Sequence, residues 1–414
     1  MSGALWLLVS CLIGSLFFLL FQGGKLASML FIIITVLSVY LILGNWSGVK
    51  NTQGVRRLPN AQQDAAIEAG QSLQIGVQVQ IPGFWPIPYV MIRDRLIRQN
   101  GEESVFEGSL VPDWKRRGEL VYSTPPLRRG LYRFGTIECL TEDVFGFFQH
   151  KGRLELQDQV TVYPQTVPIR EWVQFHQMLK GIQHHSATTR VHRETTQING
   201  VREYIYGDRL SRIHWNATAK TGTWKSKEFE RESLPKTIIM LDRTARAYRD
   251  AAEFELAVSV AASLFRYASS RELALGLLSI GKDATYLEAK MSQNHHKQIM
   301  SHLVGVEADG THPLIHTVKE KSRQMPAGSF FVLISPQKGS VMMQALNHLE
   351  HLHMNPCHIW IHGAASGAVK AQTANPANGQ EDWIKIMRAQ GYTGYEVRQL
   401  NELSNLLGGV KRYA

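Results

Sequence analysis

Two uninterrupted apolar stretches open the chain. Residues 4–21 and 26–44 carry no charged side chain, and only Gln22-Gly23-Gly24-Lys25 separates them. Each stretch is about as long as a helix needs to cross a hydrocarbon core of roughly 30 Å. The pattern predicts a transmembrane helical hairpin over residues 1–48. A cleaved signal peptide is the alternative, but it would combine a basic segment with one short apolar segment, and this sequence has neither.

The flanking cations predict the orientation of this hairpin. Lys50, Arg56 and Arg57 follow the second stretch, whereas the turn carries only Lys25. The positive-inside rule then places both termini, and all residues after 50, in the cytoplasm. Three widely spaced cysteines without a Cys-x-x-Cys pair also fit a reducing compartment. We therefore expect a protein of the inner or plasma membrane with two spans and cytoplasmic soluble domains.

After the apolar stretches, short alternating segments predict β-structure. Residues 71–81 alternate between polar and apolar side chains, which is the period of a half-buried strand. Further strands are expected within residues 90–97, 118–123, 128–149 and 160–169, with Gly and Pro turns between them. The pattern favours a small β-sandwich-like domain over residues 49–170.

From residue 237 the pattern changes to apolar strands that alternate with helices. Strands are expected at 237–242, 273–280, 330–335, 357–362 and 396–400, and helices at 251–268, 341–353 and 401–407. Fully apolar strands joined by helices are typical of a mostly parallel, doubly wound α/β sheet, here over residues 236–414. Small or polar residues at 181–199 and 364–380 predict surface loops.

Residues 171–235 link the two domains and contain a distinctive run of polar and aromatic positions. It reads Arg202-x-Tyr204-x-x-Gly207-Asp208-x-x-Arg212-x-x-Trp215, with His214 before the tryptophan and the run KEFERE at 227–232. Together with the hairpin, the segment RRGLYRFG and a strand that ends in Asp242, it resembles the bacterial family called domain of unknown function 58. The resemblance covers nearly the whole chain.

The resemblance implies an architecture and a partner. It implies that the C-terminal α/β domain is like the von Willebrand factor A domain. Members of the family are commonly encoded beside MoxR-type AAA+ ATPases and often beside a membrane transglutaminase-like protein, which implies a role in a membrane-associated assembly. No catalytic activity is established for the family as a whole.

A-type domains bind a metal through Asp-x-Ser-x-Ser and later Thr and Asp residues, and the matching positions here are degenerate. Asp242 and Thr244 fit the first two positions, but Arg246 occupies the third, and the later strand ending in FVLISPQKG lacks the Asp. A guanidinium has no acceptor atom, and its charge repels a cation. We therefore expect no Mg²⁺ and no other cofactor. Arg246 either forms an ion pair with Asp242 or lies in solvent while Asp242 caps the loop, or the pocket takes a partner's carboxylate directly.

The signature has three interpretations. As a brace, Gly207 and Asp208 form a turn, Arg202 and Arg212 bind carboxylates, and aromatic side chains at Tyr204 and Trp215 pack between the domains. As a catalytic site, Asp208 and His214 would be a base and its orienting group. The third interpretation is partner recognition. The sequence has no nucleophile elbow, Walker loop, HExxH or GxGxxG motif, which favours the brace.

Other features add little to these expectations. The formal net charge of +10 suits a domain tethered to an anionic leaflet, and no basic run with interleaved aromatics points to nucleic acid. A group of histidines, His348, His351, His353 and His358, is expected on a solvated surface rather than at a metal. The sequence thus favours a non-enzymatic scaffold or adaptor that works with a MoxR-type ATPase. The alternatives are a metal-dependent ligand-binding A-domain module and a hydrolase that uses Asp208 and His214.

Overall fold

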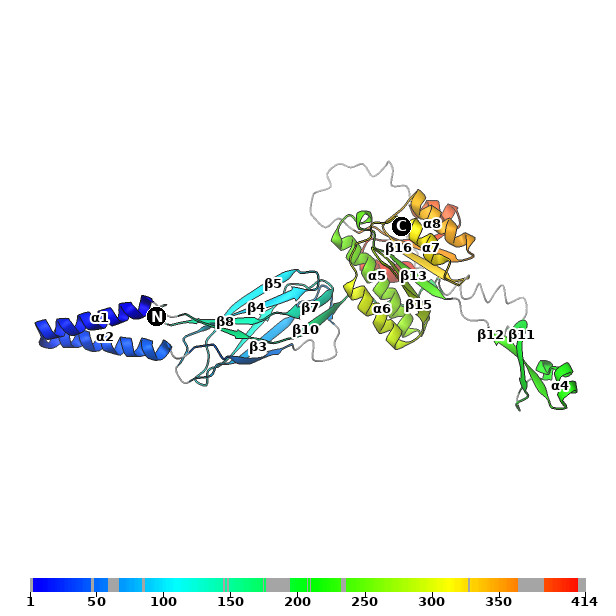
Figure 1. Ribbon diagram of the computed structural model, residues 1–414. Coiled ribbons are helices and arrows are strands. Elements are labelled where there is room, and N and C mark those ends of the chain that lie inside the picture. The colour runs from blue at the N-terminus through cyan, green and yellow to red at the C-terminus, as the bar shows by residue number, and fades with distance from the viewer. Residues whose placement is uncertain are drawn as a thin grey trace, which may run out of the picture. The chain divides into compact units, whose positions relative to one another are not determined.

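The structure is a computed structural model that describes residues 3–45, 48–58, 67–83, 86–143, 146, 149–173, 175, 194–206, 208, 210–231, 236–326, 328–363 and 383–408. Gly207, the predicted loop at 364–380 and most of the predicted loop at 181–199 lie outside these residues. The chain divides into two compact units, residues 1–165 with 300–306, and residues 166–299 with 307–414 (Figure 1). The finer boundaries predicted at residues 48, 170 and 235 stay predictions.

The apolar stretches form two helices, α1 at Gly3–Gln22 and α2 at Gly24–Asn45. They lie side by side (Figure 1) because Gly23 and Gly24, at φ angles of 57° and 87°, adopt the left-handed conformations that reverse the chain. Within the described residues, Gly24–Leu43 is long and apolar enough to cross a membrane, with a mean hydropathy of 2.7, and Trp6–Gln22 is a shorter apolar helix. An N-terminal helix of this kind is typical of a membrane anchor and also of a signal sequence.

The predicted β domain contains two sheets. The first has the order β1-β3-β6, all antiparallel, with bounds Gln53–Arg57, Gln74–Gln80 and Arg117–Ser123. The second has the order β2-β10-β7-β4-β8-β9, with β5 paired to β4; their bounds are Ile67–Glu68, Gln159–Tyr163, Gly130–Phe134, Val90–Arg98, Ile137–Glu142, Gln149–Leu154 and Glu103–Leu110. Apolar side chains of both sheets form one core, which includes Val77 of β3 and Ile92 of β4.

A buried ion pair joins these two sheets. The Arg56 guanidinium on β1 donates to both carboxylate oxygens of Asp94 on β4, at 2.9 to 3.1 Å, and also binds Asp158 at 2.8 Å. Tyr122 on β6 donates to Asp94 at 2.6 Å, and Arg56 lies 4.0 Å above the Phe134 ring. The side chains of Arg56 and Asp94 are 0% and 1% exposed, so each charge depends on the other for its solvation.

The C-terminal sheet has the order β15-β14-β13-β16-β17-β18. Its strands are Ala284–Lys290, Leu275–Ile280, Thr237–Asp242, Phe330–Ser335, Asn355–Ile361 and Thr393–Val397. All neighbours are parallel except β15, which is antiparallel to β14. The helices are α5 at Ala251–Ser270, α6 at Gln293–Gly305, α7 at Leu314–Ser322, α8 at Ser340–His351, α9 at Trp383–Ala389 and α10 at Leu403–Leu407. The predicted alternation of helices with the strands of a mostly parallel sheet is therefore present.

The last strand of this sheet and the position of His358 differ from the sequence prediction. The last strand is Thr393–Val397 and not residues 396–400, because Thr393–Val397 pairs in register with Cys357–Ile361 and a 3₁₀ turn begins at Leu400. His358 is completely buried on β17 rather than solvated, and its Nδ1 accepts a hydrogen bond from Trp383 Nε1 at 3.0 Å. Burial lowers the pKa of His358 to about 3.

We predict that the substitution Arg56→Met destabilises the β domain by about 3–5 kcal/mol, because it leaves the buried Asp94 carboxylate without its cation. The matched control is Arg93→Met, which removes exposed ion pairs to Glu107 and Glu138 and should cost less than about 1 kcal/mol. Hydrogen exchange of the β3 and β4 amides in the full-length protein measures the loss of stability in each variant. Equal losses in the two variants would show that the buried pair has no special role.

Candidate functional site

Asp242 is the last residue of β13. It lies at the carboxyl ends of the parallel strands, which is where parallel α/β folds bind ligands. Its Oδ1 accepts from Thr244 N at 2.9 Å and Thr244 Oγ1 at 2.7 Å. Its Oδ2 accepts from Ser335 Oγ at 2.6 Å and Gln337 Nε2 at 2.9 Å. Asp242 is 0% exposed, and this burial raises its pKa although the four donors oppose the shift. Ser335 and Gln337 were not singled out in the sequence, because they belong to the end of the neighbouring strand β16 and to the loop after it.

The cations beside Asp242 are directed elsewhere. Arg243 is nearly buried and binds Asp309 at 2.7 Å and the carbonyl oxygen of Glu307 at 2.9 Å. Arg246 is exposed on a 3₁₀ turn at Ala245–Ala247, while Asp242 takes its hydrogen bonds from Thr244, Ser335 and Gln337. This is the arrangement in which Asp242 caps the loop and Arg246 faces solvent.

The residues around Asp242 do not fit a divalent metal. Mg²⁺ needs several oxygen ligands in octahedral geometry. Asp242 is the carboxylate here, and its two oxygens already accept four hydrogen bonds, two of them from the hydroxyls that would have to be ligands. In the described part of the chain, no group of three or more His, Cys, Asp or Glu side chains could hold a metal ion.

The segment that contains the pattern from Arg202 to Trp215 forms a small structural module, which we call the signature module and define as the described residues within 194–231. Two antiparallel strands, β11 at Glu194–Glu203 and β12 at Lys225–Arg231, flank a 3₁₀ turn at Leu210–Arg212 and a short helix, α4, at Trp215–Thr221. The sequence placed this segment as a link between domains and did not predict its hairpin.

Two of the signature's polar residues close the loop after β11. Arg202 Nη2 binds Asp208 Oδ1 at 2.7 Å, and Asp208 Oδ2 accepts from Ile205 N at 3.2 Å. The Tyr204 hydroxyl donates to the Asp208 carbonyl oxygen at 3.4 Å. The hydrogen bond from Arg202, supported by that from Ile205, holds the pKa of Asp208 below its ordinary value of 3.8. Asp208 therefore has the turn-forming role and the Arg202 partner that the sequence predicts for a brace.

His214 has a structural task as the N-cap of α4. Its Nδ1 accepts from Ala217 N at 3.1 Å, and Gly222, at a φ of 69°, closes the other end of the helix. The hydrogen bonds of Asp208 and His214 thus go to other groups rather than to each other. Arg212 is half-buried at the end of the 3₁₀ turn. The geometry gives no support to a base and orienting pair.

The module exposes a group of large apolar side chains, which we call the aromatic surface. Its members and exposed fractions are Ile205 63%, Tyr206 100%, Leu210 65%, Trp215 64% and Trp224 52%. The Trp224 ring lies 6.4 Å from Trp215 and 5.5 Å from Tyr204, and it borders an open hollow of about 510 Å³. Of these members the sequence pointed only to Trp215, because the others do not belong to the signature pattern.

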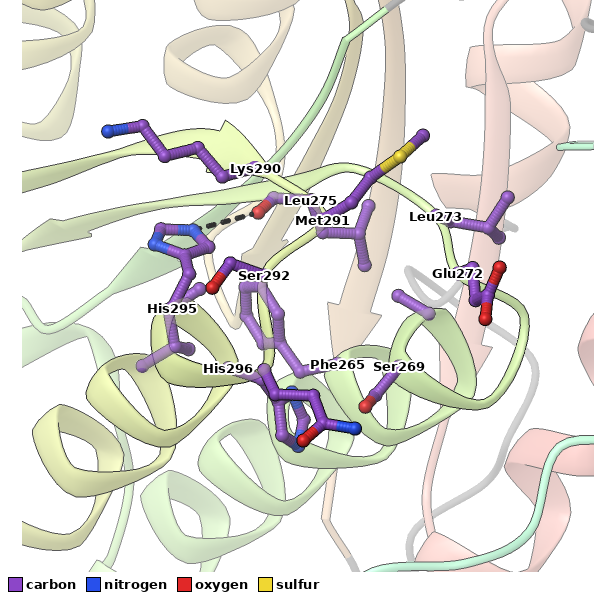
Figure 2. Close-up of a pocket in the computed structure, with 13 residues that line it drawn as sticks. Phe265, Ser269, Glu272, Leu273, Leu275, Lys290, Met291, Ser292, His295 and His296 are labelled. Atoms are coloured by element: carbon purple, nitrogen blue, oxygen red, sulfur yellow. Dashed lines mark hydrogen bonds between the residues drawn. The ribbon is translucent and has the colours of Figure 1, made fainter.

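A separate pocket of about 210 Å³ lies between the end of α5 and the start of α6 (Figure 2). Phe265 and Leu275 contribute apolar walls, and His295 and His296 project from α6. His295 Nε2 lies 3.2 Å from the Leu275 carbonyl oxygen, and burial lowers the pKa of His296. No residue predicted from the sequence to be functional lines this pocket.

Comparisons with known proteins agree with the resemblance inferred from the signature. The family model described as "Protein of unknown function DUF58" matches residues 200–353. The "Uncharacterized protein YeaD" of Bacillus subtilis (strain 168) is 26% identical over 307 residues, which make up 73% of this chain and 74% of that protein. Neither description states an activity.

Two solved structures are remotely similar to parts of the chain. Proximal thread matrix protein 1 from the mussel byssus has a TM-score of 0.30 and 12% identity, over 42% of this chain and 46% of that protein. The CARDB domain of a Pyrococcus furiosus protein has a TM-score of 0.19 and 16% identity, over 28% of this chain and 94% of that domain. At these values neither bears on the fold or function of this chain.

We predict that calorimetric titration of the full-length protein with Mg²⁺ or Mn²⁺ gives no binding heat. The reason is that a cation at Asp242 would have to displace four established donors and would gain no second carboxylate. Metal binding that disappears in the variant Thr244→Val would contradict this prediction and would favour the metal-dependent ligand-binding module.

We predict that Asp208→Asn opens the loop after β11, because an amide loses the charge-assisted bond from Arg202. Amide exchange of residues 203–206 in the full-length protein should accelerate, with Glu203→Gln, at an exposed ion pair to Lys225, as the matched control. The wild type should behave like the variant at low pH. Because the folded pKa of Asp208 lies below the unfolded value, its stabilisation is present above that value and is lost as the pH falls through the folded pKa. Unchanged exchange, together with loss of a turnover that the wild type shows, would favour the hydrolase.

Proposed function

We propose that this protein is a non-enzymatic, membrane-anchored scaffold or adaptor that binds a protein partner through the aromatic surface. The observation that carries the proposal is the exposure of Tyr206, Leu210, Trp215 and Trp224 on one small module. Clustered exposed apolar side chains mark interaction sites, and Trp and Tyr are the residues enriched among the anchors of protein interfaces.

The anchor in this proposal is the pair α1 and α2, which crosses the inner or plasma membrane twice with the soluble units in the cytoplasm. Its support is the length and hydropathy of α2 and the cations that follow it. Arg56 is folded into the β domain, so Lys50 and Arg57 are the exposed ones among the three cations that follow α2.

The C-terminal unit in this proposal is an A-like domain that has lost its metal. Its support is the order of the sheet, in which the first strand, β13, lies between β14 and β16 and the edge strand β15 is antiparallel. A buried Asp with hydroxyl neighbours ends the first strand, but the donors that surround it hold the loops together instead of a cation.

The partner in this proposal is a MoxR-type AAA+ ATPase, with a membrane transglutaminase-like protein as a further component. This part rests on the resemblance carried by the signature, from Arg202 to Trp215. The structure adds a surface that such a partner could contact. The polar signature residues build the module, and the exposed side chains of the aromatic surface, which include Trp215 of the signature, do the binding.

We predict that affinity purification of the tagged full-length protein from solubilised membranes recovers an AAA+ ATPase. The double variant Tyr206→Ala with Leu210→Ala should lower its recovery about tenfold or more, because truncating interface anchors costs 2 kcal/mol or more. Both side chains are largely exposed, so the fold should survive. The matched control is Ile386→Ala, an exposed apolar side chain on α9. Equal recovery of the ATPase with all variants would show that the binding surface lies elsewhere. If no stable partner is recovered at all, the scaffold proposal is wrong.

A further inference from the structure

We propose that the end of the β domain nearest to α2 docks on the membrane surface, with the turn at residues 111–116 in the bilayer interface. We call this segment the Trp114 turn. The proposal rests on the membrane anchoring proposed above and concerns a second surface, distinct from the aromatic surface of the signature module. Its ligand is the headgroup region of the bilayer that α2 enters.

The chain is fastened to the β domain almost as soon as α2 ends. Gly48 lies against the His150 ring of β9, Val49 is 0% exposed, and a side chain at Gly152 would collide with the Val49 carbonyl group. Thr52 Oγ1 donates to Val49 O at 2.8 Å. Val49 is only four positions after Asn45, the last residue of α2, and four residue steps span about 14 Å at most. This end of the domain therefore stays close to the bilayer.

Strand register brings the Trp114 turn to the same end. Gln53, the first residue of β1, pairs with Gln80 at the end of β3, and Gln80 pairs with Arg117 at the start of β6. Two strand spacings of about 4.8 Å separate Gln53 from Arg117. The turn that precedes Arg117 is thus about 10 Å across the sheet from the point where the chain arrives from α2.

The turn is built rigidly and presents apolar side chains outward. Arg117 N donates to Asp113 Oδ1 at 2.7 Å, and Arg116 N donates to Asp113 O at 2.8 Å. Ile81 N donates to Arg116 O at 3.0 Å, which ties the turn to β3. At its tip Trp114 is 96% exposed, so its indole contributes nothing to the packing of the domain.

The composition of the turn suits the interface between lipid and water. Val111, 76% exposed, adds a second apolar side chain to Trp114, and tryptophan is enriched at the headgroup level of membranes. The exposed cations Lys115 and Arg117 flank it, and Lys50 follows α2. An anionic leaflet attracts such cations. The chain between the membrane helix and the domain is short, the tip of the turn is aromatic, and positive charges flank it. Together these three features favour the bilayer, rather than a protein partner, as the surface that the turn contacts.

The test places a fluorescent reporter beside Trp114 and leaves the tryptophan in place. Val111→Cys is labelled in a Cys11→Ser background of the full-length protein, because the other cysteines, Cys139 and Cys357, are buried. The protein is reconstituted in nanodiscs of phosphatidylcholine and phosphatidylglycerol that contain nitroxide-labelled lipid. We expect lipid quenching several-fold stronger than at Asn100→Cys, which lies in the turn at the opposite end of β4 and β5. The further substitution Trp114→Glu should reduce the quenching at residue 111 to the level at residue 100.

A third reporter, Ile33→Cys on α2, separates this proposal from the anchoring on which it rests. Strong quenching at residue 33 with equal, weak quenching at 111 and 100 would overturn the docking and leave the anchor intact. Weak quenching at residue 33 would overturn the anchor and the docking with it. A reporter at 111 that is shielded from aqueous quenchers but not quenched by lipid would mean that protein covers the turn, which also overturns the proposal.

Discussion

The burial of the Asp242 carboxylate is the constraint on which the C-terminal unit depends. All residues of β13 are buried, and the last of them is Asp242. Its carboxyl group, whether charged or protonated, therefore has no water around it. Removing a carboxylate from water is costly unless fixed donors replace the hydration shell. Thr244 supplies donors from the loop after β13, Ser335 from the last residue of β16, and Gln337 from the loop that follows β16. The loops after β13 and β16 are therefore held in one arrangement, and the same arrangement leaves no vacant oxygen for a cation.

Elements with a complete apolar pattern could be predicted from the sequence, and elements with a mixed pattern could not. β13, β16 and α5 were found because nearly every position, or every third and fourth position, is apolar. β15 was missed because it lies at the sheet edge and most of its side chains are only half-buried. For the residues around Asp242, too, only what lies close together in the sequence could be predicted. Asp242 and Thr244 are close in sequence, but Ser335 is 93 residues away, and only the register of β13 with β16 brings it to the carboxylate.

The signature module contains residues with two different roles, folding and binding, which the sequence pattern does not distinguish. Arg202, Asp208 and His214 are used inside the module, where they close a loop and begin a helix. The side chains that reach solvent most fully, Tyr206 and Leu210, lie between the signature positions. A substitution in the first group is expected to act through folding, and one in the second group through binding. This division explains why polar signature residues can look catalytic without being so.

The N-cap of α4 also has a consequence for the aromatic surface. Nδ1 of His214 accepts a hydrogen bond from Ala217 N, one of the backbone donors at the start of the helix that have no partner within it. The helix that carries Trp215 begins at this residue and has only two turns. The position of Trp215 on the aromatic surface therefore depends on this cap, although His214 itself is not part of that surface.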